Sequence, residues 1–149
     1  MAVNIEDEIR TVLLTLSAVT AYTGSDSDTA RIRSYKLDES DDKTEEHIII
    51  EVDAETREND LDGLAGLPLC DVNISCRAKT RTLANALSEA VRVNGTDLGT
   101  GLAGYGGSGT AFDSWLMDET PSVLRWDDGS DRKWHTVEMH FRVQYTETV

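Results

Sequence analysis

The stretch Cys70-Asp-Val-Asn-Ile-Ser-Cys-Arg-Ala78 alternates strictly between apolar and polar residues. A period of two over such a length is typical of a β-strand with one buried face and one solvated face. Outward from it, His47–Ala54 and Trp134–Thr146 show the same alternation. The sequence therefore predicts a sheet with one apolar face.

Two amphipathic helices are predicted to cover that face. Residues 4–17 and 80–93 each place apolar side chains on one stripe at helical spacing, and Asn4 is a suitable N-cap for the first helix. Weaker strand patterns lie in 30–37, expected to be an edge or bulged strand, and within 112–126, expected to be interrupted or ended by Pro121. Asp128-Gly129 predicts a hairpin turn.

The predicted fold is therefore α+β, with a mainly antiparallel sheet of four to five strands and two helices packed on one face. The order is α-β-β-β-α-β-β, in a single domain spanning 1–149. Two projecting loops are expected. An acidic, hairpin-like loop spans 38–46, and a mobile loop with seven glycines spans 95–109.

The chain carries 28 acidic and 14 basic residues, a formal net charge of −14. Such a surface repels phosphate backbones, which argues against ordinary nucleic-acid binding. Only four of the basic residues are lysines. The acidity is explained either by simple solubility or by adaptation to a halophilic, high-salt cytoplasm, where salt screens self-repulsion.

The two cysteines are interpreted as reduced core thiols. Cys70 and Cys76 lie six residues apart on one face of the predicted strand. At ~3.3 Å per residue their Cα atoms are about 20 Å apart, which exceeds the ~7 Å limit for a disulfide. No apolar run approaches the ~20 residues that span a bilayer, and the N-terminus lacks signal-peptide features. We expect a protein made and kept in the cytosol, or packaged from it, with no membrane partner.

No cofactor or catalytic site is predicted. A phosphate-binding loop follows a strand, opens a helix and ends in Lys-Ser or Lys-Thr, whereas the glycines of 95–109 follow a helix and include no lysine. Neither the histidines nor the cysteines have metal-site spacing, and the acidic runs lack the final glutamate of a calcium loop. No nucleophile is marked by an adjacent base. We expect a protein that is not an enzyme.

The order of these elements resembles the tail terminator proteins of long-tailed viruses, also called minor tail or tail completion proteins. The segment Thr80–Val91 is similar to the second helix of that family, and Glu138–Glu147 is similar to its final strand. The resemblance covers nearly the whole chain in pattern and length.

The resemblance implies a structural protein of the virion. Such proteins form a ring, usually a homohexamer, that caps the tail tube, stops polymerisation of the tube protein and provides the attachment surface for the head-tail connector. DNA passes through the lumen of the ring. Acidic side chains lining that lumen would keep DNA from adhering.

Two groups of residues are candidates for partner binding. The leucines of the 55–69 connection form either a contact surface or a lid over the core. The residues in or beside the Gly-rich loop offer aromatic and aliphatic anchors, although Trp115 alone fits a core residue as well. The candidates are Leu61, Leu64 and Leu67 in the first group, and Leu102, Tyr105, Trp115 and Leu116 in the second.

Three alternatives remain at this point. A neck or head-tail adaptor protein would share the ring geometry. An acidic DNA-mimic inhibitor needs rows of carboxylates, which interleaved arginines such as Arg77 and Arg142 disfavour. A small-molecule binding module needs a convergent polar set, and the sequence shows none.

Overall fold

A computed structural model describes residues 4–37, 41, 45–56, 59–60, 63–64, 69–93, 101–106, 112–125 and 133–145, with only the backbone described for 53–56, 59–60, 63–64 and 125. The elements are α1 (Ile5–Thr15), α2 (Ser17–Thr23), β1 (Ile32–Ser34), β2 (His47–Thr56), β3 (Asn59–Asp60), β4 (Gly63–Leu64), β5 (Leu69–Ala78), α3 (Arg81–Val93), β6 (Phe112–Arg125) and β7 (Lys133–Tyr145).

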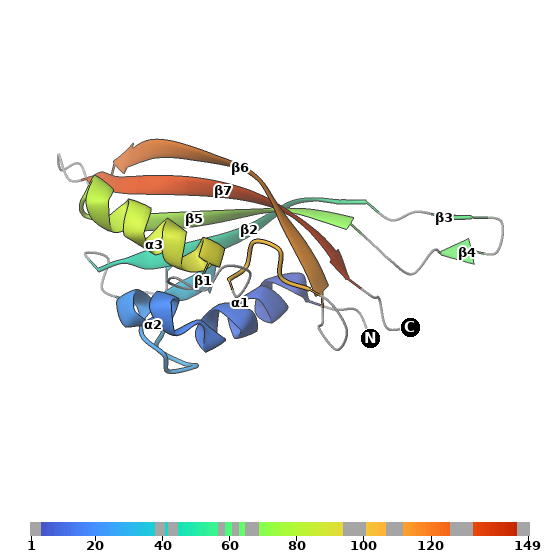
Figure 1. Ribbon diagram of the computed structural model, residues 1–149, viewed down its shortest axis with the longest axis horizontal. Coiled ribbons are helices and arrows are strands. Elements are labelled where there is room, and N and C mark those ends of the chain that lie inside the picture. The colour runs from blue at the N-terminus through green and yellow to red at the C-terminus, as the bar shows by residue number, and fades with distance from the viewer. Residues whose placement is uncertain are drawn as a thin grey trace.

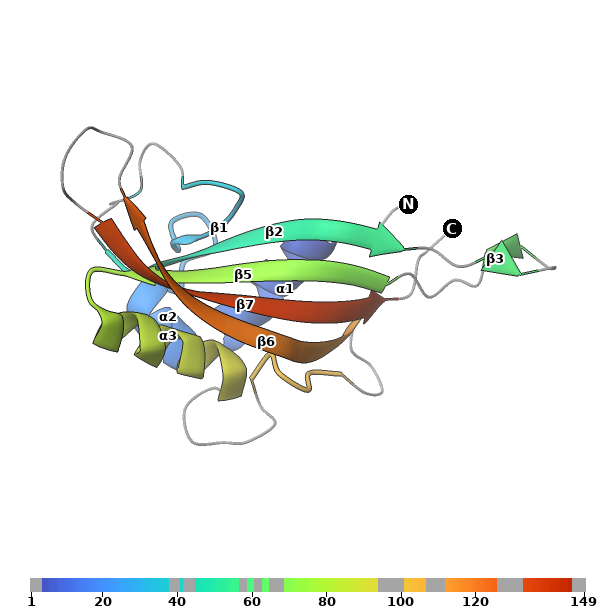
Figure 2. The same cartoon turned by 90° about the horizontal axis from the view of Figure 1, so that it is seen from above.

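The main sheet has the strand order β1-β2-β5-β7-β6, and only the β1–β2 pair is parallel. All three helices lie on one side of it, as Figure 1 shows. The other side forms the open face that is seen in front of the helices in Figure 2. This arrangement confirms an α+β fold with a mainly antiparallel sheet.

The stretch that decides the fold is β5, in the middle of the sheet. Its even-numbered side chains, from Cys70 to Ala78, are all buried under the helices. Ile74 is in register with Ile50 on one side and Met139 on the other. Alternation on three neighbouring strands thus builds a mostly aliphatic core, because each strand contributes every second side chain to the same layer.

The helix starts follow from their capping residues. The Asp7 backbone NH donates to Asn4 Oδ1 (3.3 Å) at the start of α1, and the Leu83 NH donates to Thr80 Oγ1 (3.2 Å) at the start of α3. The backbone becomes extended at Leu16, which separates α1 from α2. Helix α2 was not predicted, and it places Val19 in the core.

Two details of the predicted strands are wrong. β1 is an edge strand as expected, but it runs parallel to β2, so the 38–46 connection cannot be a hairpin. Within that connection the structure describes Asp41, whose carboxylate pairs with Arg33 (3.0 Å) and is 4% exposed. Strand β6 also runs through Pro121 without a break, in register with Val137. The turn at Asp128-Gly129 lies outside the described residues, although β6 and β7 pair antiparallel as its prediction requires.

Candidate protein interface

Strand β6 carries most of the large hydrophobic side chains that the described residues expose. Trp115 is 44% exposed, Met117 55%, Val123 46% and Leu124 37%. We call these four residues the β6 surface. The strand forms one edge of the main sheet (Figure 2). Trp115 and Leu124 face the open side of the sheet and Val123 faces the helix side, so the four residues lie along the strand rather than in one cluster. Exposed apolar side chains on an edge strand are typical of a site where another protein binds.

The backbone edge of β6 is poorly suited to pairing with another strand. Both backbone polar groups of Ser114 point away from β7, because its NH donates to Tyr105 O and its carbonyl accepts from Gly104 NH. Ser114 lies opposite Val143 and Pro121 lies opposite Val137, six residues away on β7. Because backbone groups in an antiparallel pair point alternately toward and away from the partner strand, the Pro121 nitrogen also points away from β7. The missing proline NH therefore removes no hydrogen bond between β6 and β7. It leaves the outer edge of β6 without a donor at this position. A bulge at Met117 interrupts it further.

The Gly-rich segment is packed where the structure describes it, at 101–106. Leu102 is fully buried in the core, and its NH donates to Val91 O (2.7 Å) at the end of α3. The prediction of a projecting loop is therefore wrong for these residues. The burial of Leu102 also removes it from the candidate anchors, because its side chain has no surface to offer a partner.

Tyr105, Trp115 and Leu116 lie close together around the start of β6. The Tyr105 ring contacts Phe112, with ring centroids 4.9 Å apart, and Tyr105 and Leu116 are half-buried against the core. Trp115 faces the open side of the sheet and is exposed, so the interpretation of Trp115 as a core residue does not hold. A run of three apolar residues, Trp115-Leu116-Met117, was the signal in the sequence, because a strand cannot turn all three inward.

The leucines at 61, 64 and 67 belong to the connection between β2 and β5. Leu64 lies in β4, which pairs with β3 in a separate two-stranded sheet. Figure 1 shows β3 and β4 beyond the end of the main sheet, away from the helices. This position does not fit a lid over the core. Leu61 and Leu67 lie outside the described residues.

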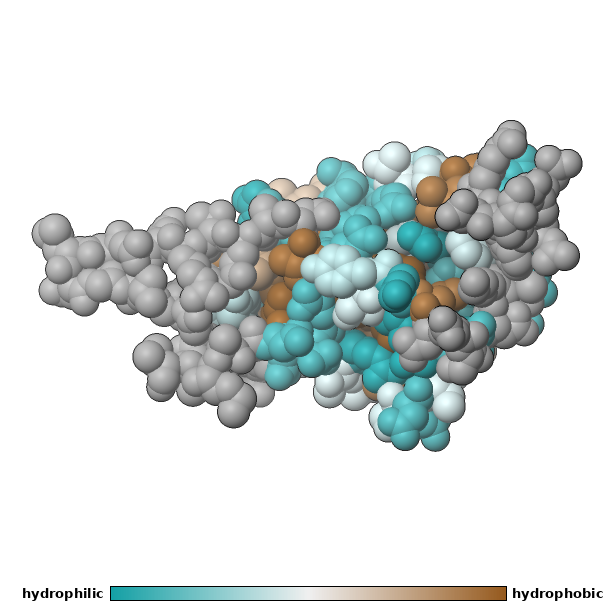
Figure 3. All heavy atoms as spheres, turned by 180° about the vertical axis from the view of Figure 1, so that it is seen from behind, coloured by the Kyte–Doolittle hydropathy of each residue, from teal (hydrophilic) through white to brown (hydrophobic). Residues whose placement is uncertain are grey.

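Charged side chains of both signs alternate across the open face beside Trp115. Arg142 Nε lies 3.3 Å from Asp71 Oδ1, and His140 Nδ1 contacts the Asp118 carboxylate. Near them, the Glu138 carboxylate accepts hydrogen bonds from Asn73 and Ser75. Exposed pairs of this kind contribute little stability. The face of the molecule in Figure 3 is likewise mainly hydrophilic, with hydrophobic residues in small separate areas.

One end of the open face contains a buried histidine. His47 is 0% exposed, its ring meets Trp134 edge to face (centroids 4.9 Å apart), and its Nδ1 donates to Glu45 O (3.1 Å). Its Nε2 has no hydrogen-bond partner, and the Arg77 guanidinium lies over Trp134. Burial, with the nearby Arg77 and Arg31 charges, lowers the pKa of His47 from 6.5 to about 4. The imidazole is therefore neutral at physiological pH.

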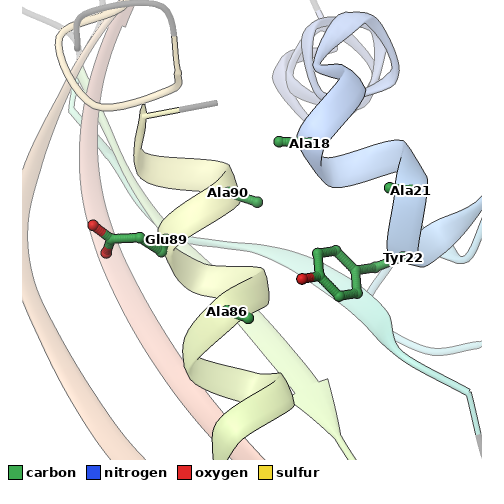
Figure 4. Close-up of a pocket in the computed structure, with 6 residues that line it drawn as sticks. All are labelled: Ala18, Ala21, Tyr22, Ala86, Glu89 and Ala90. Atoms are coloured by element: carbon green, nitrogen blue, oxygen red, sulfur yellow. The ribbon is translucent and has the colours of Figure 1, made fainter. Parts of the chain in front are cut away.

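A shallow groove of about 330 Å³ runs between α2 and α3. Figure 4 shows alanines on both helices along it, with the Tyr22 ring directed across toward α3 and the Glu89 carboxylate directed away. Small side chains let the two helices approach closely. The groove offers no convergent polar groups for chemistry. Its residues are Ala18, Ala21, Tyr22, Ala86, Glu89 and Ala90.

The remaining candidates for chemistry are structural. Cys70 and Cys76 are reduced and buried, as predicted, and burial raises the pKa of Cys76. Across the described residues, no group of three or more His, Cys, Asp or Glu side chains is placed to hold a metal ion. Within the same part of the chain, no helix is long and apolar enough to cross a membrane.

Comparison with known proteins gives a match at the level of fold. No protein-family model and no curated protein matches the sequence. Among solved structures, a chain of the "Virion of native gene transfer agent (GTA) particle" superposes with a TM-score of 0.57 at 14% identity. The match covers 97% of this chain and 95% of that chain. The two proteins therefore share a fold over nearly their whole lengths.

Proposed function

We propose that this protein is a structural component of a virus-like particle. The observation that carries the proposal is the match, over nearly the full length of both chains, to a chain from a gene transfer agent virion. A fold alone does not define a function. The β6 surface supplies independent support, because exposed apolar side chains along an edge strand suit a protein that acts by assembly.

Within such a particle, we assign the chain to the tail. It forms a ring, as a homohexamer, that caps the tail tube, stops polymerisation of the tube protein and provides the attachment surface for the head-tail connector. The resemblance in element order supports this role, and so does the net charge of −14 in each copy. A ring of six such copies repels DNA, which then passes through the lumen without adhering.

A neck or head-tail adaptor protein is the second candidate, since its ring would use the same fold. An acidic DNA mimic fits the open face poorly. There the Asp71 carboxylate is paired with Arg142, and Arg77 lies over Trp134, so the carboxylates do not form an uninterrupted row.

Electron microscopy of particles made without this chain tests the role directly. Overlong tails that are not attached to heads are expected if the protein terminates the tube. Filled heads beside tails of normal length would assign the chain to the neck instead. Complete, infectious or transducing particles would overturn the proposal of a structural role.

A further inference from the structure

The exposed large hydrophobic side chains of the described residues occupy two opposite edges of the main sheet. Four form the β6 surface at one edge. The fifth, Tyr35, is 55% exposed and follows β1 at the other edge. The strand order places β1 and β6 at opposite edges, and Figure 2 shows the first part of β6 on the side of the sheet away from β2. One copy cannot bring these two patches together.

Tyr35 is held outward by a strained backbone. Its φ is +67°, and the Lys36 NH donates to Ser34 O (2.8 Å), the pattern of a classic γ-turn, which is rare and strained. The Tyr35 hydroxyl donates to Glu6 Oε1 (3.2 Å), and the Tyr35 backbone NH donates to Ile50 O (3.0 Å). Strain maintained at an exposed aromatic residue points to a role in binding.

The two edges also differ in their charge, since β6 is acidic whereas the Tyr35 edge is close to neutral and exposes a lysine, Lys36. Residues 30–37 contain Arg31, Arg33 and Lys36 and no acidic residue, although the chain as a whole has twice as many acidic as basic residues. Strand β6 contains three acidic residues and a single cation at its last position. Asp41 offsets Arg33, and Glu6 and Glu51 lie near Tyr35. The exposed Lys36 is therefore the cation at this edge that can meet the acidic residues of β6.

Neither edge offers an open row of backbone groups. On β1, Ile32 O accepts from Arg10 Nε (2.6 Å) and Ser34 O accepts from Lys36 NH. On β6, the bulge at Met117 and the ring of Pro121 interrupt the row. A partner that binds at either edge is therefore held by side chains rather than by strand pairing.

We infer that the β6 surface of one copy binds the Tyr35 edge of a second copy, head to tail. This inference rests on the proposed function, because a ring of identical copies is built from heterologous contacts of this kind when the rotation between copies closes. A two-fold contact of β6 with β6 is disfavoured, since it would bring together two strands that each carry three acidic residues and one cation.

Cysteine crosslinking of the full chain tests the contact. Tyr35→Cys and Met117→Cys variants are purified separately, mixed and oxidised. Mass spectrometry is expected to show a disulfide-linked dimer with one copy of each variant, while each variant alone stays uncrosslinked. Thr82→Cys, at an exposed position on α3, is the control and should not crosslink to either. The native cysteines are buried and do not compete.

Charge reversal provides the second readout. Lys36→Glu on the Tyr35→Cys chain, or Glu119→Lys on the Met117→Cys chain, should lower the dimer yield several-fold, and the two together should restore it. Absence of the mixed dimer, or self-crosslinking of Met117→Cys alone, would overturn the inference. If particles lacking the protein still have overlong tails in that case, the proposed function stands and only this contact fails.

Discussion

The backbone NH of Leu102 donates to the carbonyl oxygen of Val91 over 2.7 Å, and this bond fixes the Gly-rich segment against the end of α3. The Leu102 side chain completes the core beneath β6. A segment whose composition is typical of a mobile linker thus becomes part of the folded domain.

Replacing Leu102 with alanine should therefore destabilise the protein strongly. Loss of a fully buried leucine leaves a cavity and costs about 2–5 kcal/mol in the free energy of unfolding. Trp115→Ala, at an exposed position, is the control and should cost well under half as much. Urea denaturation of both variants measures the difference. Equal midpoints would show that the segment does not contribute to the core.

Gly101 allows the same segment to approach α3. A Cβ added there would lie 2.3 Å from the Arg92 carbonyl oxygen, which belongs to the helix backbone and cannot move freely. We expect Gly101→Ala to cost about 1–3 kcal/mol through overpacking.

Gly104→Ala is the matched comparison for that substitution. Gly104 has a φ of +76° but open space around its Cβ position, so its change should cost only about 1 kcal/mol of backbone strain. Chemical denaturation ranks the two variants. A Gly104 variant that is less stable than the Gly101 variant would contradict the packing described here.

Much of the fold follows from local periodicity. The alternation of Cys70–Ala78 and the apolar stripe of the 80–93 helix are patterns of neighbouring residues. Both predict structure correctly because a sheet and a layer of helices each pack through one apolar face. The direction of β1 is different in kind. Its three residues pair parallel with β2 because of where α1 and α2 place the chain, and no short-range pattern records that.

The candidate interface was predicted only in part. Trp115 was identified by its type and position, whereas the exposure of Met117, Val123 and Leu124 depends on a bulge and on β6 being at the sheet edge. The exposure of Tyr35 depends on its own positive φ, and nothing in the sequence of 30–37 indicates that backbone conformation. Edges and bulges depend on which strands pair, so they become visible only in the assembled sheet.

The native thiols should be unreactive in the folded protein. Cys70 and Cys76 are buried, and burial raises the pKa of Cys76 and so suppresses the reactive thiolate. A thiol reagent added at pH 8 is expected to label neither residue until denaturant unfolds the chain. Rapid labelling of the native protein would show that β5 opens, and its alternation would then not describe a stable central strand.

His47 should make the protein less stable as the pH falls below neutrality. Above about pH 6.5 the imidazole is neutral in both the folded and the unfolded chain, so it adds no pH dependence. Below that value His47 is protonated in the unfolded chain but stays neutral in the folded chain, because burial lowers its pKa to about 4. At 1.36 kcal/mol per pKa unit, the free energy of unfolding should fall by about 3 kcal/mol between pH 6.5 and pH 4.

His47→Gln isolates this contribution, because glutamine is polar but does not titrate in that range. Removing the ring contact with Trp134 should lower the stability of the variant at pH 7.5. Between pH 6.5 and pH 4, however, its stability should decline less steeply than that of the native chain, since the contribution of His47 is then absent. Urea midpoints measured at half-unit steps give both slopes. Parallel curves for the two proteins would mean that His47 takes up its proton in the folded state, and that the histidine beside Trp134 is open to solvent.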